Sequence, residues 1–479
     1  MGPDFQRPSP PAVKGYTSEP LAAQPASANP SESQTPHFVE GGDIPAQWWS
    51  LFHSEALNRL VERALKANPN LQAAQATLRQ AQENVYAAEG TLYPSINANG
   101  SVVRQQTNGA QNGQANPGSL FTLYNASVSV SYGIDLFGAA RRTLESFSAQ
   151  EEYQRFQLEG AYLTLTSNVV TTAVQEASLR AQIAATREII DDEKHQLELL
   201  QNQYSVGGVS LSSVLAQQTA LAQTSANLPQ LEKQLAQIRN QLAALAGYFP
   251  SENELDAFDL DMLQLPQELP VSLPSKLVEQ RPDIRAAESQ LHAASAEVGV
   301  ATANLFPQFT LTGNAGSVSN TAGGLFSAGA GIWSIGAGLT QPIFHGGTLL
   351  HQKRAAVAAY DSAAAQYRGV VLSAFQDVAN VLDALRADQN IFDAQKTAEQ
   401  SAADSLDITR KQYQIGAASY LALLNAQQAY QQTRIALAQA RASRYADTAA
   451  LFHSLGGGWW NRGADAGPAA GDQPGAGKP

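Results

Sequence analysis

Residues 125–136 read Asn-Ala-Ser-Val-Ser-Val-Ser-Tyr-Gly-Ile-Asp-Leu, with an apolar side chain at every second position. This period of two predicts a β-strand with one apolar face and one polar face. The polar positions carry mostly small or hydroxylated side chains, and aromatic residues lie towards the ends of the segment. Both features are typical of a strand in a membrane β-barrel. A strand of a soluble β-sandwich shares the alternation and is the alternative.

Three further strands are predicted around this one. The strand that contains residues 125–136 is predicted at 121–137, and a second alternating segment, at 330–344, has Gln341 as the single polar exception on its apolar face. Each of the two has a shorter partner, predicted at 95–105 and at 308–317. Known bacterial barrels begin at about eight strands, so four strands supply only a fraction of one. The chain is therefore expected to form an oligomer.

The sequence around these strands occurs twice. Asn68-Pro69-Asn70-Leu71 corresponds to Arg281-Pro282-Asp283-Ile284, and the same register aligns Leu92-Tyr93-Pro94 with Leu305-Phe306-Pro307. Each copy reads as a helix, two strands, a very long helix, a turn and a final helix. These correspondences predict an internal two-fold repeat.

Two helices of unusual length are predicted at 139–205 and 347–414, because neither segment contains a proline. At about 1.5 Å per residue, each would be roughly 100 Å long. Their Ala- and Gln-rich composition favours close packing of antiparallel helices. A fibrous coiled coil has a similar composition, but the strands and the repeat count against it. The helix that opens the first copy is predicted in one piece from Ala56 to Glu89.

Glycine followed closely by serine predicts a tight helical turn at 207–210 and at 416–419, leading into helices at 211–246 and 420–455. The predicted segments are an extended Pro/Ser/Ala-rich N-terminal segment (1–45), a first repeat (46–247), an inter-repeat linker (248–272), a second repeat (273–456) and a flexible C-terminal tail (457–479).

Composition excludes several classes of function. The net charge is −12 and the basic residues are scattered, so no nucleic-acid partner is expected. The chain has no cysteine, and its seven histidines lack metal-ligand spacing. No nucleophile elbow or phosphate loop occurs. We therefore expect no enzyme, no catalytic residues, no cofactor and no metal, and we interpret Arg281-Pro282-Asp283 as a helix start.

Seven motifs spread over nearly the whole chain resemble one family, the TolC-like outer-membrane factors of tripartite efflux. The resemblance is strongest to the lipoprotein branch, which is paired with resistance-nodulation-division pumps. The motifs are Gly2-Pro3-Asp4-Phe5-x-Arg7-Pro8, Trp48-Trp49-x-x-Phe52, Leu136-Phe137-Gly138-x-x-Arg141-Arg142, Arg281-Pro282-Asp283-Ile284-Arg285-x-Ala287-Glu288, Pro342-Ile343-Phe344-x-Gly346-Gly347, Tyr413-x-x-Gly416-x-x-Ser419-Tyr420-Leu421 and Leu455-Gly456-Gly457-Gly458-Trp459.

The resemblance implies a mixed α and β membrane protein. Three copies would form a transmembrane β-barrel in outer-membrane lipid, continued by a periplasmic α-barrel of long antiparallel helices. It also implies a lipid anchor on a cysteine preceding residue 1. The implied partners are a periplasmic adaptor protein and an inner-membrane resistance-nodulation-division pump.

The implied function is a passive exit duct for drugs or other small toxic compounds, gated at its periplasmic helical tip. A duct for type I protein secretion is the alternative within the same class. A soluble helical scaffold is the alternative from a different class, and it would need no detergent for extraction.

The resemblance places the constriction at Leu421 and Asn425, after the second turn, with Tyr413 before it. Relatives often carry carboxylates in this segment, whereas this chain has Ala422 and Asn425. We therefore expect a gate of Leu421 apolar contacts and Asn425 hydrogen bonds, with an opening that is less sensitive to pH and cations. The second hairpin is the part expected to move.

The two helical turns are the expected contact with the adaptor. Each turn places an apolar residue directly before a glycine, and these four are the candidate docking residues: Val206, Gly207, Ile415 and Gly416.

Overall fold

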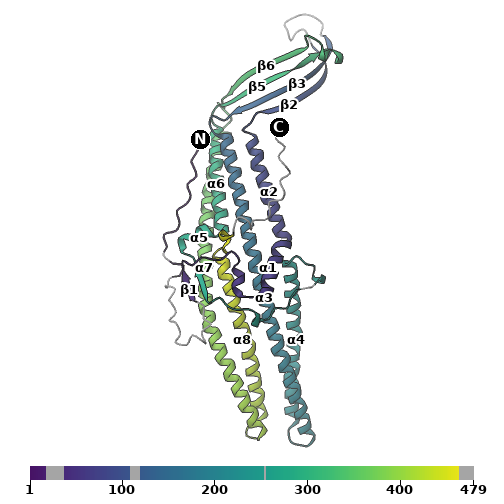
Figure 1. The fold of residues 1–479 in the computed structure, drawn as a ribbon, viewed down its shortest axis with the longest axis vertical. Coiled ribbons are helices and arrows are strands. Elements are labelled where there is room, and N and C mark those ends of the chain that lie inside the picture. The colour runs from purple at the N-terminus through teal and green to yellow at the C-terminus, as the bar shows by residue number, and fades with distance from the viewer. Residues whose placement is uncertain (14, 18–36, 108–118, 253–254, 463–479) are drawn as a thin grey trace. The chain divides into compact units, whose positions relative to one another are not determined.

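The computed structural model describes residues 1–13, 15–17, 37–107, 119–252 and 255–462 (Figure 1). The chain divides into two units, which we describe separately. The first unit comprises residues 1–8, 76–155 and 286–369, and the second comprises residues 9–75, 156–285 and 370–479. Most of the predicted N-terminal segment after residue 17 lies outside the described residues, as does the C-terminal tail from residue 463.

A four-stranded antiparallel sheet with the order β2-β3-β5-β6 forms part of the first unit (Figure 1). Its strands are β2 (Ser95–Gln106), β3 (Leu120–Ile134), β5 (Gln308–Ser319) and β6 (Gly331–Thr340). Two of the strands end earlier than the sequence predicts. β3 ends at Ile134 and not at 137, and β6 ends at Thr340 and not at 344. Asp135 accepts a hydrogen bond from the backbone N–H of Arg141 (3.0 Å) and turns the chain into the next helix. Pro342 has no N–H with which to continue β6.

The register places apolar side chains of all four strands on one face of the sheet. Residues directly opposite each other in an antiparallel pair share a face. One apolar row across the sheet consists of Ile96, Val130, Gly313 and Ile335. The adjacent row, on the other face, consists of Asn97, Ser129, Asn314 and Ser334. The sheet therefore has one apolar and one polar surface.

The helix predicted in one piece from Ala56 to Glu89 is instead two helices, α1 (Glu55–Ala67) and α2 (Pro69–Gly90). Asn68 between them is extended, with φ −67° and ψ 121°, because a residue before proline avoids the helical region. Its side-chain oxygen accepts hydrogen bonds from the N–H groups of Asn70 (2.9 Å) and Leu71 (3.3 Å). The same side chain therefore caps the start of α2.

The second copy has the same break, between α5 (Pro274–Gln280) and α6 (Pro282–Ala303). Arg281 is extended there, with φ −80° and ψ 123°. The interpretation of this motif as a helix start agrees with the structure, in which Asp283 lies in the first turn of α6.

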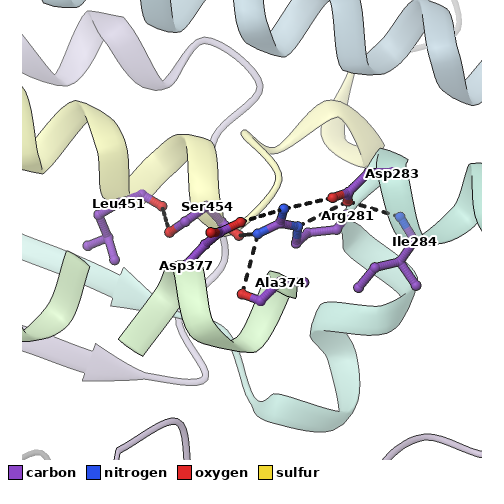
Figure 2. A network of polar contacts seen from close by, with 7 residues as sticks. All are labelled: Arg281, Asp283, Ile284, Ala374, Asp377, Leu451 and Ser454. Carbon is purple, nitrogen blue, oxygen red and sulfur yellow. Dashed lines mark hydrogen bonds and ion pairs between the residues drawn. The ribbon is translucent and has the colours of Figure 1, made fainter. Parts of the chain in front are cut away.

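Arg281 ties three helices of the second unit together (Figure 2). Its side chain is 9% exposed and donates hydrogen bonds to the carboxylates of Asp283 (2.7 Å) and Asp377 (3.0 Å). It also donates to the carbonyl oxygens of Ala374 (3.4 Å) and Ser454 (3.2 Å). The motif therefore joins the start of α6 to α7 (Thr348–Gln414) and to the end of α8 (Tyr420–Ser454).

Arg281→Ala is expected to lower the stability of the second unit by about 2–3 kcal/mol, because hydrogen bonds to a buried charged group are lost. The measurement is the denaturant midpoint of the full chain in detergent. Arg354→Ala, at an exposed position of α7, is the control and should leave the midpoint unchanged. Equal midpoints for the two variants would show that the Arg281 contacts contribute no net stability.

The four long helices form two consecutive pairs along the chain, each made of a longer helix, a tight turn and a shorter helix. α3 (Ala139–Ser205) and α7 have 67 residues each, while α4 (Leu211–Leu245) and α8 have 35 each. We call residues 185–235 the first hairpin and residues 392–442 the second hairpin; both lie in the second unit. Ser210 and Ser419 cap the returning helices by accepting the N–H groups of Ser213 (3.3 Å) and Ala422 (3.2 Å).

Part of the second unit was not predicted from the sequence. A parallel pair of strands, β1 (His37–Glu40) and β4 (Glu268–Val271), joins the N-terminal segment to the inter-repeat linker. The flexible tail predicted from residue 457 begins too early, because Gly457 has φ +68° and packs against Leu163. Trp459 Nε1 also donates a hydrogen bond to the Gln280 carbonyl oxygen (2.6 Å). Residues 457–462 are thus part of the packed structure.

Candidate functional site

The two helical turns expose an apolar side chain beside a glycine. Val206 and Ile415 are 83% and 80% exposed. Gly207 and Gly416 have φ values of +78° and +75°, and a Cβ atom at either position would meet nothing within 4 Å. The four residues predicted to bind the adaptor therefore lie at the surface of the turns.

The predicted constriction residues lie on one face of the first turns of α8. Leu421 is 62% exposed and Asn425, four residues later, is also exposed. Residues four apart on a helix share a face. Leu423 and Leu424, between them, are 1% and 8% exposed and pack inside the protein. Leu421 and Asn425 thus face away from the packing of their own chain.

Tyr413, the third predicted constriction residue, contacts the first hairpin. Its hydroxyl donates a hydrogen bond to Gln203 Oε1 on α3 (3.3 Å). Its ring meets the ring of Tyr420 edge-on, with 6.2 Å between the centroids. Burial raises the pKa of the Tyr413 hydroxyl. Tyr413 thus takes part in a contact between the hairpins, whereas Leu421 and Asn425 are exposed.

Tyr420 begins a polar network between the hairpins that the sequence did not reveal. Its hydroxyl contacts Gln217 Oε1 on α4. Gln217 Nε2 in turn donates to the backbone carbonyl of Glu193 on α3 (3.0 Å). Thr224 Oγ1 donates to Glu193 Oε1 (3.1 Å) and accepts from Gln431 Nε2 on α8 (3.4 Å). Two residues of the second hairpin are thereby bound to the first hairpin.

A signal for this network was present in the sequence. Val214, Gln217, Ala220 and Thr224 are all buried, at spacings of three and four residues, so they form the inward stripe of α4. Two of the four are polar. Polar residues on a buried stripe require partners, and Gln217 and Thr224 could have been singled out for that reason.

Glu193 is the titratable group at the centre of the network. It is 4% exposed, and its Oε2 atom has no hydrogen-bond partner among the described residues. Burial raises the pKa of its carboxyl, although the hydrogen bond from Thr224 acts in the opposite direction. Burial also raises the pKa of Tyr420, and the nearby Tyr413 and Glu193 add to this effect.

A second buried carboxyl lies between α7 and α8. Asp388 is 9% exposed, and burial together with the adjacent Asp447 carboxyl raises its pKa, while Arg444 opposes the shift. The Arg444 guanidinium lies over the ring of Phe392, 4.5 Å from its centroid. Asp388, Arg444 and Asp447 all lie just outside the second hairpin, on the parts of α7 and α8 next to it.

Within the described residues, no cluster of three or more His, Cys, Asp or Glu side chains is placed to hold a metal ion. Over the same residues, no helix combines the length and the apolar character needed to cross a membrane. The candidate site therefore consists of three features described above. They are the exposed apolar surface of the turns, the helix face with Leu421 and Asn425, and the polar contact between the two hairpins.

Comparison with known proteins adds an independent line of evidence. The model of the outer membrane efflux protein family matches residues 60–248 and 273–457. The pyoverdine export outer membrane protein OpmQ of Pseudomonas aeruginosa is 33% identical over 422 residues, covering 86% of this chain and 87% of the relative. The cation efflux system protein CusC of Escherichia coli is 27% identical over 468 residues, covering 96% and 95%.

Solved structures agree with these matches. The outer-membrane channel OprN has a TM-score of 0.87 with 28% identity, covering 96% of this chain and 99% of that chain. The outer membrane protein VceC of Vibrio cholerae has a TM-score of 0.81 with 27% identity, covering 87% and 100%. The predicted TolC-like fold, outer-membrane location and efflux-channel function are confirmed. The chain therefore belongs to the outer membrane efflux protein family, whose members are channel proteins.

Proposed function

We propose that three copies of this chain form the passive exit duct of a tripartite efflux system. The observation that carries the proposal is the sheet. One of its faces is apolar, with Trp333 and Ile335 78% and 84% exposed, and within the described residues β2 and β6 each pair along one side only. In lipid, unpaired strand edges are too costly to persist. Pairing β6 of one copy with β2 of the next satisfies both edges and closes a barrel.

The gate of this duct is proposed to lie at the hairpin tips. Leu421 and Asn425 face away from their own chain, so around a three-fold axis they can meet the same residues of the other copies. The contacts of Tyr413 and Tyr420 with the first hairpin hold the second hairpin in the closed position. Conduction involves no catalytic step, cofactor or bound metal.

Two partners are proposed from the family resemblance, a periplasmic adaptor and an inner-membrane resistance-nodulation-division pump. The exposed turns with Val206, Gly207, Ile415 and Gly416 are the adaptor contact. The adaptor can shift the gate only through a higher affinity for the open state. Relatives carry the names pyoverdine export protein, toluene efflux pump protein and cation efflux system protein, which supports small compounds as the cargo rather than secreted proteins.

A lipid anchor on a cysteine preceding residue 1 fits the position of the N-terminal residues. The Met1 backbone nitrogen donates a hydrogen bond to the Phe137 carbonyl oxygen (2.9 Å), three residues beyond the end of β3. Gly2 has φ +94°, and a Cβ atom there would lie 2.5 Å from Gly299 Cα. The start of the chain is thus held beside the sheet that faces lipid.

Leu421→Ala is expected to raise the single-channel conductance of the protein reconstituted in planar lipid bilayers, because it removes the apolar side chain at the constriction. Leu215→Ala is the matched control, since Leu215 is a 52% exposed leucine of the first hairpin. It should conduct like the parent. A Leu421→Ala conductance no higher than that of the parent would remove Leu421 from the gate, and a parent that forms no channels would overturn the exit duct itself.

A further inference from the structure

Glu193 is a buried acid without a counter-ion. It belongs to α3, and the hydrogen bond from Thr224 reaches only one of its two carboxyl oxygens. Among the described residues, no arginine or lysine forms an ion pair with it. Removing a carboxylate from water without such a partner carries a large free-energy cost, whereas a neutral carboxylic acid pays far less. The closed tip therefore favours the protonated form of Glu193.

The charged residues around Glu193 are bound to other groups. On α3 itself, Asp192 pairs with Arg410 of α7 (3.7 Å) and Lys194 pairs with Asp191 (3.3 Å). Two further ion pairs lie five and six residues before Glu193 along α3, Glu188 with Arg434 of α8 and Arg187 with Glu232 of α4. The residues of α4 and α8 in this network are uncharged. Thr224 contacts the carboxyl and Gln217 contacts the Glu193 backbone carbonyl, while Gln431 and Tyr420 contact Thr224 and Gln217 in turn.

The position of Glu193 makes its charge relevant to the gate. Thr224 bridges its carboxyl to Gln431, and Gln217 bridges its backbone to Tyr420. Gln431 and Tyr420 are residues of the second hairpin, while Glu193, Gln217 and Thr224 belong to the first. A charge at this point would draw water into the contact between the hairpins.

We propose that Glu193 makes opening of the tip proton-dependent, the neutral acid holding the two hairpins together and the carboxylate loosening them. This inference rests on the proposed function, because it assumes that separation of the hairpins opens the duct. The proton leaves to bulk water when the carboxyl ionises. This proton-dependent opening differs from the expectation, drawn from the sequence, of a gate with little pH sensitivity. That expectation considered only Ala422 and Asn425.

The sign of the effect follows from the raised pKa. Burial raises the pKa of Glu193 in the closed tip, so the closed state binds the proton more tightly than an open state in which the carboxyl is hydrated. The closed contact is fully formed below the ordinary pKa of glutamic acid. It weakens as the pH rises through the raised pKa. Higher pH therefore favours opening.

The test is the open probability of the reconstituted channel in planar bilayers, recorded over a pH series that starts near the ordinary pKa of glutamic acid and extends upwards, because burial raises the pKa of Glu193. All recordings use an Asp388→Asn background, because burial and the adjacent Asp447 also raise the pKa of the Asp388 carboxyl, which must not contribute to the pH response. The open probability of the parent is expected to rise on the order of fivefold or more across this range. A change of this size is typical of coupling between an effector and a conformational change. Glu193→Gln, which mimics the neutral acid, should stay at the low value throughout.

Glu198→Gln is the matched control, because Glu198 is an exposed residue of the same helix. It should keep the full pH response of the parent. A parent without a pH response, or a Glu193→Gln variant that retains one, would overturn the inference while leaving the exit duct intact. A parent that forms no channels at any pH would instead overturn the proposed function.

Thr224→Val provides a second readout that a purely structural role would not produce. Valine keeps the volume of threonine but loses the hydroxyl that donates to Glu193 Oε1 and favours its charged form. The midpoint of the pH response should therefore move to higher pH. An unchanged midpoint would contradict Glu193 as the titrating group, even if Glu193→Gln failed to assemble.

Discussion

Ile335→Arg is expected to abolish assembly of the protein in the outer membrane. Ile335 is 84% exposed and belongs to the apolar face of the sheet, paired with Gly313 of β5. An arginine on the lipid face near the middle of the membrane costs about 2–4 kcal/mol. In an oligomer of identical chains every copy carries this cost. The measurement is the amount of heat-resistant oligomer recovered from outer-membrane fractions.

Ser334→Arg is the control, because Ser334 is the neighbouring residue of β6 and belongs to the polar row with Asn97, Ser129 and Asn314. If that face lines a water-filled channel, arginine is hydrated there and assembly should be close to that of the parent. Equal loss of both variants, or equal recovery of both, would contradict the assignment of the two faces. The comparison thus tests the orientation of the sheet and not only its presence.

Gly416→Trp is expected to abolish export while leaving the oligomer intact. The turn is exposed, and a Cβ atom at this position meets nothing within 4 Å, so the ring has open space into which it can extend. It does occupy the surface beside Ile415, where we propose that the adaptor binds. Survival of cells on toxic compounds measures export, and heat-resistant oligomer on gels measures assembly.

Gly416→Asn separates docking from backbone strain. Gly416 has φ +75°, a left-handed conformation that asparagine adopts at low cost and tryptophan adopts less readily. The asparagine variant should retain most of the export activity. If it exports as poorly as Gly416→Trp, backbone conformation rather than the exposed surface explains the loss. Full export by Gly416→Trp would exclude this turn from the adaptor contact.

The strands show which features of the fold the local sequence pattern can predict. Alternation over residues 125–136 predicted β3, because side chains of a strand point to alternate faces and leave a period of two in the sequence. The ends of the strands were less accurate. β3 stops before 137 because Asp135 caps α3, a contact between residues six apart that no periodic pattern records.

The gate region shows the opposite case. The family resemblance proposed Leu421, Asn425 and Tyr413 as constriction residues. Nothing local distinguished Tyr413, which binds Gln203, from the other two, which are exposed. The break at Asn68 was also missed, although Pro69 marks it. The strong helical period on both sides of Asn68 outweighed a single proline in the interpretation.

Periodicity, glycine turns and motif order are local properties of the sequence, and they were enough to predict most of the elements, their order and the family. The contacts between polar residues could be found only once the packing of the helices was known. Glu193, Thr224 and Gln431 are far apart in the chain and become partners only when α3, α4 and α8 pack together. The alternation in residues 125–136 indicates which side of β3 is apolar. The protonation of Glu193, by contrast, depends on its burial, which arises only when the hairpins pack together.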